Sequence, residues 1–261
     1  MQPANARVYY YSSTQHGTGT GGLAAGIGYT PASAVYPRGS MTDFADTFRA
    51  LFVNLADWVA RDVAPPDSQV PRVGDGTLVR PQDLRFPAMR GTVWPQAGGA
   101  AVPDFRYRAL FNEFTLLDYG STYRPQDESG IPAFLPPRRV GRDYAILVPQ
   151  VDASTGLTRA GIRNVDVRAP LGTSLEFNYV ATPGIVDLVN LTGSYIPFHT
   201  TEAARIAAGD GRPSLQSLYG SQAGYVAAVT TAANALVAER FLLRADADRR
   251  IARAQATTVL P

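Results

Sequence analysis

The stretch RVYYYSSTQHG, residues 7–17, decides how this chain is interpreted. Valine, three tyrosines and a serine at positions 8–12 favour an extended strand. Residues 14–28, by contrast, are dense in glycine, which is typical of a loop. His16 therefore stands at the mouth of a loop that follows a strand. An imidazole in such a place is suited to carry protons near neutral pH, so His16 is the one candidate catalytic residue that the sequence offers.

Composition excludes several classes of protein. The chain has 261 residues, 45% of them hydrophobic, which is enough for one large domain or two small ones. It holds no cysteine, so disulfides, thiolate zinc sites and a cysteine nucleophile are excluded. A formal net charge of +2 gives no reason to expect a nucleic-acid partner. We find no apolar run long enough to span a membrane and no signal-peptide core, and the compartment stays open.

Residues 42–66 predict the strongest helix. Thr42 fits as its N-cap, and Asp43 suits the positive end of the helix dipole. Two prolines, Pro65 and Pro66, end it. Large apolar residues recur at helical spacing and form one stripe, which should pack against a large partner surface. The stripe consists of Phe44, Phe48, Leu51, Phe52, Leu55, Trp58 and Val59.

We divide the chain into three parts. Residues 1–63 are expected to hold a terminal core strand, the His16 loop and the packing helix. Residues 64–143 form an irregular excursion rich in proline and glycine, and residues 144–261 contribute strands and then C-terminal helices. The expected strands cover 144–151, 162–167, 175–180 and 186–192. One helix is expected over 200–209 and a last one over 245–254. Between them, a helix that begins at Ser214 is expected to break at Gly220–Ser221 and to continue to residue 241.

Other motifs point to no cofactor or metal. Residues 17–22, GTGTGG, match a dinucleotide fingerprint in letters, but no capped helix opens there. The stretch from Asp152 to Gly156 resembles the start of a calcium loop, yet Arg163 replaces the acidic twelfth residue, so a β-turn is expected. Two histidines cannot build a three-histidine metal site. His199 precedes a helix and is interpreted as a capping or surface residue.

A loop histidine after a strand also fits serine-based acyl chemistry. A serine hydroxyl needs an imidazole to take its proton, and a carboxylate to orient that imidazole. In α/β-hydrolases the order is nucleophile, acid, histidine, so His16 fits only if the other two precede residue 1. No G-x-S-x-G elbow exists, since GTSLE at 172–176 and GSQAG at 220–224 both fail, and no acid precedes Asp43. A loop histidine held by backbone groups stays an open alternative.

Several stretches taken together resemble the bacterial α/β-hydrolase-domain family over nearly the whole chain. They are residues 7–17, 44–59, 63–66, 80–87, 161–162, 169–173, 191–198, 212–215 and 219–243. The resemblance implies an α/β chain that forms the C-terminal part of an α/β-hydrolase-like fold. It also implies that His16 is the triad base and that the serine lies upstream of this chain. The partner would then be the missing N-terminal portion of the same enzyme.

The expected function is hydrolysis of an ester or related acyl bond in a small molecule, with His16 as general base and no cofactor. The chain alone is expected to be inactive. Two alternatives remain: a non-catalytic binding or structural module that uses the aromatic-rich residues 104–123, and a pseudo-hydrolase scaffold. If the partner surface of the 44–59 stripe is missing, the isolated chain should aggregate, form oligomers or be partly unfolded.

Overall fold

The computed structural model describes residues 3–19, 33–94, 100–111 and 114–260. Its α-helices are α1 (Ala45–Arg61), α2 (Val165–Arg168), α3 (Glu202–Ala208), α4 (Leu215–Tyr219), α5 (Gln222–Ala238) and α6 (Arg244–Ala256), with a 3-10 turn at Pro81–Asp83. Its strands are β1 (Leu78–Val79), β2 (Val93–Trp94), β3 (Ala100–Ala101), β4 (Thr115–Asp118), β5 (Tyr123–Arg124), β6 (Ser129–Gly130), β7 (Arg138–Asp143), β8 (Val148–Pro149), β9 (Gly172–Leu175) and β10 (Ser194–Pro197).

The described strands pair antiparallel in twos, as β1 with β8, β2 with β3, β4 with β7, β5 with β6, and β9 with β10. The strand expected at residues 8–12 does not form as a ladder. Tyr9 bridges Gln69 in parallel, and Tyr11 bridges Ile162 in parallel. Each partner segment is matched at a single bridge only, so no continuous ladder develops between residues 8–12 and either of them.

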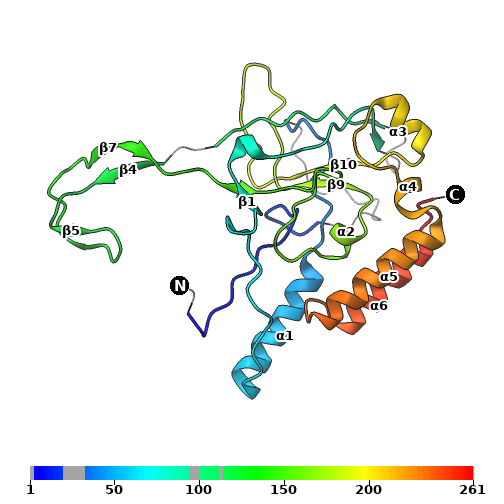
Figure 1. The fold of residues 1–261 in the computed structure, drawn as a ribbon, viewed down its shortest axis with the longest axis horizontal. Helices are drawn as coiled ribbons and strands as arrows, with labels where there is room; N and C mark the ends of the chain where they lie inside the picture. Colours follow the sequence, from blue (N-terminus) through cyan, green and yellow to red (C-terminus); the bar gives the residue numbers. More distant parts are fainter. Residues whose placement is uncertain (1–2, 20–32, 95–99, 112–113, 261) are drawn as a thin grey trace.

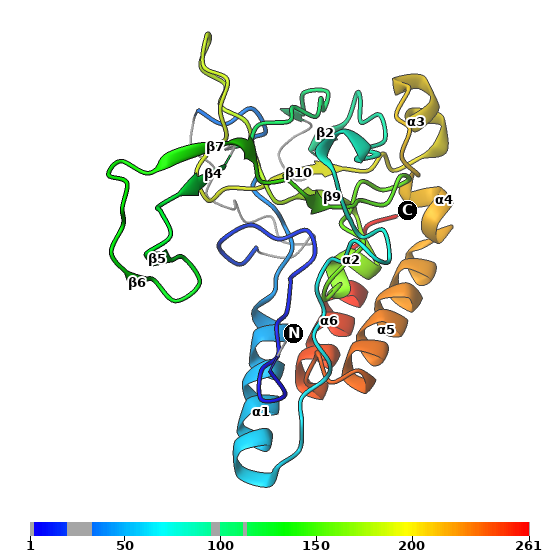
Figure 2. The ribbon, with the colours of Figure 1, turned by 60° about the vertical axis from the view of Figure 1, so that its left-hand side comes forward.

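The helices gather at one end of the molecule. Helices α5 and α6 lie side by side, and α1 stands next to them (Figures 1 and 2). A hydrophobic cluster fills the space between α2, α5 and α6 and reaches the N-terminal segment through Tyr9, whose ring meets Phe241 at 5.8 Å. A second cluster surrounds β9 and β10 and includes Tyr36, Met89 and Phe105.

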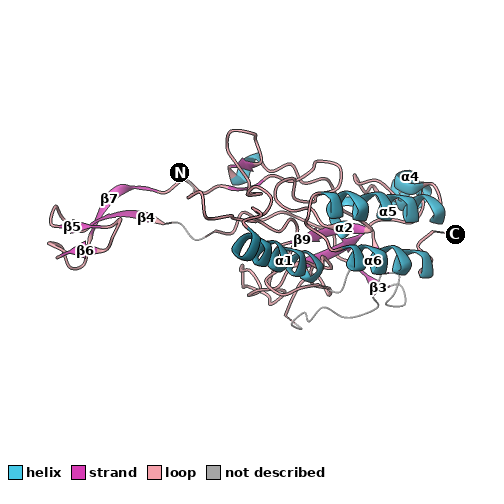
Figure 3. Cartoon of the chain, turned by 90° about the horizontal axis from the view of Figure 1, so that it is seen from below, coloured by secondary structure: helices cyan, strands magenta, loops and turns pink. Residues whose placement is uncertain are grey.

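A thin arm projects from the side opposite the helices. It consists of β4 and β7, with β5 and β6 toward its tip (Figures 1 and 3). The arm belongs to the stretch 64–143, which was expected to be irregular. Other residues of that stretch, among them Met89 and Phe105, are buried in the body. The stretch is therefore partly a projection and partly core.

Helix α1 has the predicted extent, but its N-cap and its buried side differ from the prediction. Its N-cap is Phe44 instead of Thr42, and the carboxylate of Asp43 accepts the Ala45 N–H at 3.0 Å. Phe48 and Val59 of the apolar stripe are 48% and 82% exposed. The buried side of the helix consists of Asp46, Thr47, Ala50 and Asn54. The described residues leave much of the predicted stripe exposed, whereas the Asp46 carboxylate on the opposite side of the helix binds Arg249 and Arg250 of α6.

Other elements differ in type or are new. Residues 165–168 form helix α2 where a strand was expected, because the Asn164 carbonyl accepts the N–H groups of Val167 and Arg168. Strand β10 was not predicted, although all four of its residues are buried. The expected break at Gly220–Ser221 is confirmed, since the Ser221 hydroxyl accepts the Gly224 N–H and caps α5. Ser214 caps α4 in the same way.

Candidate active site

The residue before His16 is anchored by two backbone groups. The side-chain oxygen of Gln15 accepts the N–H of Ser40 at 3.0 Å and that of Gly193 at 2.9 Å. A Cβ at Gly193 would lie 2.3 Å from the Leu175 carbonyl oxygen and 3.1 Å from the Gln15 Cβ. Only glycine therefore permits the approach that joins the His16 loop to the start of β10.

The residues after His16 are anchored to the start of α1. The Thr18 hydroxyl donates to the Asp43 carboxylate at 2.6 Å, and the Gly19 N–H donates to the Thr42 carbonyl at 3.0 Å. A Cβ at Gly19 would lie 2.5 Å from the Met41 carbonyl carbon. The imidazole of His16 is exposed between these two anchors. Most of the glycine-dense stretch that follows, residues 20–28, lies outside the described residues.

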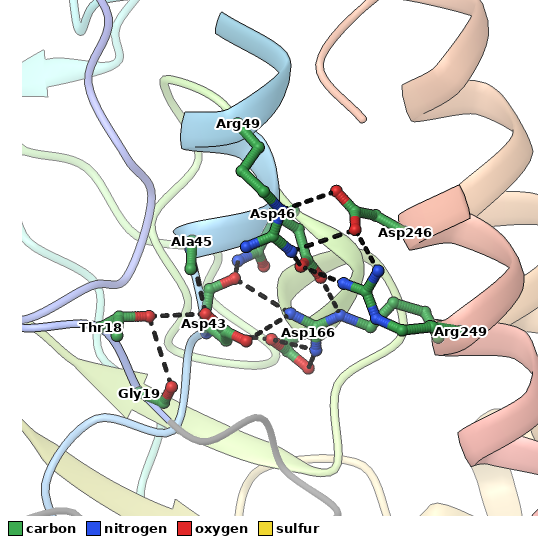
Figure 4. Close-up of polar contacts among 11 residues, drawn as sticks. Thr18, Gly19, Asp43, Ala45, Asp46, Arg49, Asp166, Asp246 and Arg249 are labelled. Carbon is green, nitrogen blue, oxygen red and sulfur yellow. Dashed lines mark hydrogen bonds and ion pairs between the residues drawn. The ribbon is translucent and has the colours of Figure 1, made fainter. Parts of the chain in front are cut away.

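The start of α1 is in turn fixed by a network of carboxylates and arginines (Figure 4). Arg250 of α6 is its centre, and its guanidinium lies 2.6 Å from Asp46, 3.0 Å from Asp43 and 3.3 Å from Asp166. Burial alone would lower the pKa of Arg250, but the three carboxylates raise it above its ordinary value. The His16 loop is thus coupled through α1 to α2 and α6.

A carboxyl group that the sequence did not single out lies in the same region. Oε1 of Glu176 accepts hydrogen bonds from the Tyr10 hydroxyl, from the Thr158 hydroxyl at 2.8 Å and from the Ser13 N–H at 3.2 Å. Ser13 has a φ of 55°, which is uncommon outside glycine. Burial raises the pKa of the Glu176 carboxyl, although these hydrogen bonds oppose the rise. In the described part of the chain, Oε2 has no hydrogen bond.

An open cavity of about 780 Å³ joins these two groups. His16 and Glu176 both line it, and Phe177 and the residues at 109–111 and 186–192 form the rest of its wall. A smaller apolar cavity of about 160 Å³ adjoins it. The two cavities share Leu110, Phe111, Glu176, Phe177 and Leu188. The fold therefore brings one imidazole and one carboxyl group, far apart in sequence, to the wall of one cavity.

Ser12, Ser13 and Ser40, which lie on or against the His16 loop, are engaged elsewhere. Ser12 donates to the Thr158 carbonyl at 2.7 Å, Ser40 donates to the Ser13 carbonyl at 2.9 Å, and the Ser13 hydroxyl accepts the Thr158 N–H. Within the described ranges, no hydroxyl or carboxylate forms a hydrogen bond with the His16 ring. The site as described consists of an exposed imidazole, a partly buried carboxyl group and two adjoining cavities.

His199 is buried, so the interpretation as a surface or capping residue is wrong. Its Nε2 lies 3.0 Å from the Arg90 carbonyl oxygen and 3.5 Å from a carboxylate oxygen of Asp210. Thr201, not the histidine, caps α3. The fully buried Arg212 donates to the same Asp210 at 2.7 Å. His199 therefore belongs to a buried polar cluster that joins β10 to α3 and α4, and it has no open face for chemistry.

The part of the chain that the structure describes contains neither a metal-ligand cluster nor a membrane-spanning helix. No three acidic or histidine side chains there come together as metal ligands would. None of the described helices combines the length and the apolar character needed to cross a membrane. The calcium-like stretch at 152–156 is a turn, as predicted, in which the Asp152 carboxylate accepts the N–H groups of Ser154 and Thr155.

A protein-family model matches most of the chain. A family model described as an alpha/beta hydrolase domain matches residues 3–252. The chain therefore belongs to this α/β-hydrolase domain family, which confirms the family that the sequence resembles. Comparison with curated proteins gives no match, nor does comparison with solved structures.

Proposed function

We propose that this chain supplies the proton-carrying half of a serine hydrolase that cleaves an ester or related acyl bond. The observation that carries the proposal is the exposed imidazole of His16 on the wall of an open cavity. The loop on each side of it is anchored, by Gln15 and by Thr18. An anchored loop with a free imidazole suits proton transfer, because a general base must reach its substrate in a fixed geometry.

In this proposal His16 takes the proton from a serine hydroxyl as its oxygen attacks the acyl carbon. The imidazolium then returns the proton to the leaving group as the acyl bond breaks, and a water molecule repeats the cycle on the acyl-enzyme. These 261 residues contain no G-x-S-x-G elbow. In this proposal the nucleophile and the backbone donors of the oxyanion hole belong to a segment N-terminal to them.

The test uses the full-length gene product and a fluorophosphonate probe, which labels activated serines covalently. Peptide mass spectrometry then identifies the labelled residue. His16→Ala should lower both ester turnover and the labelling rate at least about 100-fold, the lower range of acid–base contributions. Arg124→Ala, at the exposed tip of the arm, serves as the control and should leave both unchanged. Turnover that survives His16→Ala would overturn the role of His16.

A second function is favoured by a specific observation. No hydroxyl or carboxylate bonds the His16 ring within the described ranges, which also suits a pseudo-hydrolase scaffold or a binding module. Absence of any labelled serine in a folded full-length protein would support that alternative, whereas a labelled serine whose reactivity depends on His16 would eliminate it.

A further inference from the structure

The smaller cavity has the character of a ligand pocket. Its walls include an aromatic group in which the ring centroids of Phe86 and Tyr107 lie 5.2 Å apart and those of Phe86 and Phe177 lie 6.4 Å apart. Val148 and Val151 contribute aliphatic surface. A mostly apolar recess with a few polar groups is the usual form of a small-molecule site.

Its size limits what it can hold. The cavity measures about 160 Å³, which is close to the roughly 150 Å³ apolar cavity known to bind benzene. A phenyl ring or a chain of about six carbons therefore fits, and a long fatty-acyl chain does not. The wall it shares with the His16 cavity means that a ligand seated here would extend toward the imidazole.

One polar group on the shared wall has unused hydrogen-bonding capacity. Of the residues that line both cavities, only Glu176 has a polar side chain, and the neighbouring Thr158 hydroxyl is committed to its Oε1. Oε2 of Glu176 has no partner in the described part of the chain. Because three donors converge on Oε1, a proton on this carboxyl group belongs on Oε2, where it can be donated to a ligand. The raised pKa of Glu176 favours that protonated form.

We propose that the cavity between Phe86, Val148 and Phe177 binds a compact apolar group of about six carbons that carries a carbonyl acceptor for Glu176. The inference rests on the proposed function, for which it names the substrate class: esters or related acyl compounds with a short or phenyl-sized apolar part. Glu176 would act as a binding residue at the junction of the two cavities.

The test measures binding and not turnover, so it is independent of the nucleophile. Linear methyl ketones of four to twelve carbons and acetophenone are titrated into the full-length gene product by calorimetry, since ketones present the carbonyl but cannot be hydrolysed. Affinity should peak near seven carbons, and acetophenone should bind within a few-fold of that peak. Unselective hydrophobic binding would instead strengthen by roughly fourfold for each added methylene.

Variants locate the site. Val148→Phe should fill the cavity and lower 2-heptanone affinity at least about tenfold, whereas Val73→Phe, at a position 64% exposed, should not change it. If Val148→Phe does not fold, Leu188→Phe at the partly exposed rim takes its place. Unchanged affinity in a folded cavity variant would overturn the proposal, as would affinity that rises steadily with chain length.

The carbonyl contact is tested by comparing 2-heptanone with 2-methyl-1-heptene, in which a methylene group replaces the oxygen. After correction for the transfer of each ligand from water to hydrocarbon, a hydrogen bond from Glu176 should make the ketone bind about 2- to 10-fold more tightly, and equal corrected affinities would overturn the role of Glu176. Size-selective ketone binding would support the ligand pocket even if no serine is labelled, whereas the absence of a labelled serine would refute the hydrolase proposal.

Discussion

At the scale of single residues, Glu176 is the group whose environment departs most from what its sequence position suggests. It follows β9, and its carboxyl group lies among Tyr10, Ser13 and Thr158 instead of in water. The other ionisable side chains on the two cavities are His16, Tyr107, Arg108 and Asp187. Tyr10 faces the carboxyl directly, and its own pKa is raised by burial and by the charge of Glu176.

This environment predicts how stability depends on pH. Burial holds the pKa of Glu176 above its ordinary value of 4.5, so the folded protein binds this proton more tightly than the unfolded chain. The resulting stabilisation is complete below pH 4.5 and is lost as the pH rises through the folded-state pKa. Glu176→Gln should remove this dependence and be at least as stable as the natural protein at pH 8.

Urea unfolding of both proteins at several pH values between 4 and 8 provides the measurement. Glu128→Gln, at an exposed position of the arm, is the matched control and should follow the natural protein at every pH. A Glu176→Gln variant that is much less stable than the natural protein at pH 8 would show that the ionised carboxylate stabilises the fold.

At the scale of elements, the joint between α1 and α6 depends on charge pairs that are partly buried. Arg250 is 10% exposed and contacts carboxylates of the α1 start and of α2. Next to it, burial alone would raise the pKa of Asp246, but hydrogen bonds from Arg49 and Arg249 hold it below its ordinary value. This stabilisation is present at neutral pH and is lost as the pH falls through that lowered value.

Removal of Arg250 should therefore be costly. Arg250→Met keeps an unbranched, flexible side chain but removes the guanidinium and so leaves the carboxylates without their central partner, which should lower the free energy of unfolding by about 3–5 kcal/mol. Arg244→Met, on the same helix but with a side chain 54% exposed, should cost no more than about 1 kcal/mol. Chemical denaturation at neutral pH separates the two, and equal small losses would mean that the network adds little.

At the scale of the whole molecule, the exposed face of α1 is the clearest apolar surface. The ring centroids of Phe48 and Phe52 lie 4.8 Å apart, and the two residues are 48% and 58% exposed. Leu55, which is 50% exposed, continues this face. Exposed apolar patches of neighbouring residues drive association. The isolated chain should therefore self-associate in a concentration-dependent way.

Sedimentation velocity over a range of concentrations tests this prediction. Phe52→Ser should lower the average mass at a given concentration, while changing the free energy of unfolding by no more than about 0.5 kcal/mol, because the side chain is already exposed. Ile206→Ser, an exposed apolar residue on α3, should leave association unchanged. A natural chain that stays monomeric at high concentration would contradict the prediction.

The sequence by itself determined the features that depend on neighbours along the chain. Helical spacing and the prolines gave the extent of α1, the serine caps gave the starts of α4 and α5, and the Asp152 turn followed from its own residues. The position of His16 in a loop after an extended segment has the same local origin. Local signals suffice here because hydrogen bonds of caps and turns join residues a few positions apart.

Only the tertiary structure decided what surrounds His16. Glu176, Gly193 and the carboxylate network reach the His16 loop from distant parts of the chain, and none carries a local signal of that contact. The same holds for α1, whose period predicts an apolar stripe but not which side is covered. Periodicity records which residues share a face, whereas the choice of the covered face depends on partners that long-range packing supplies.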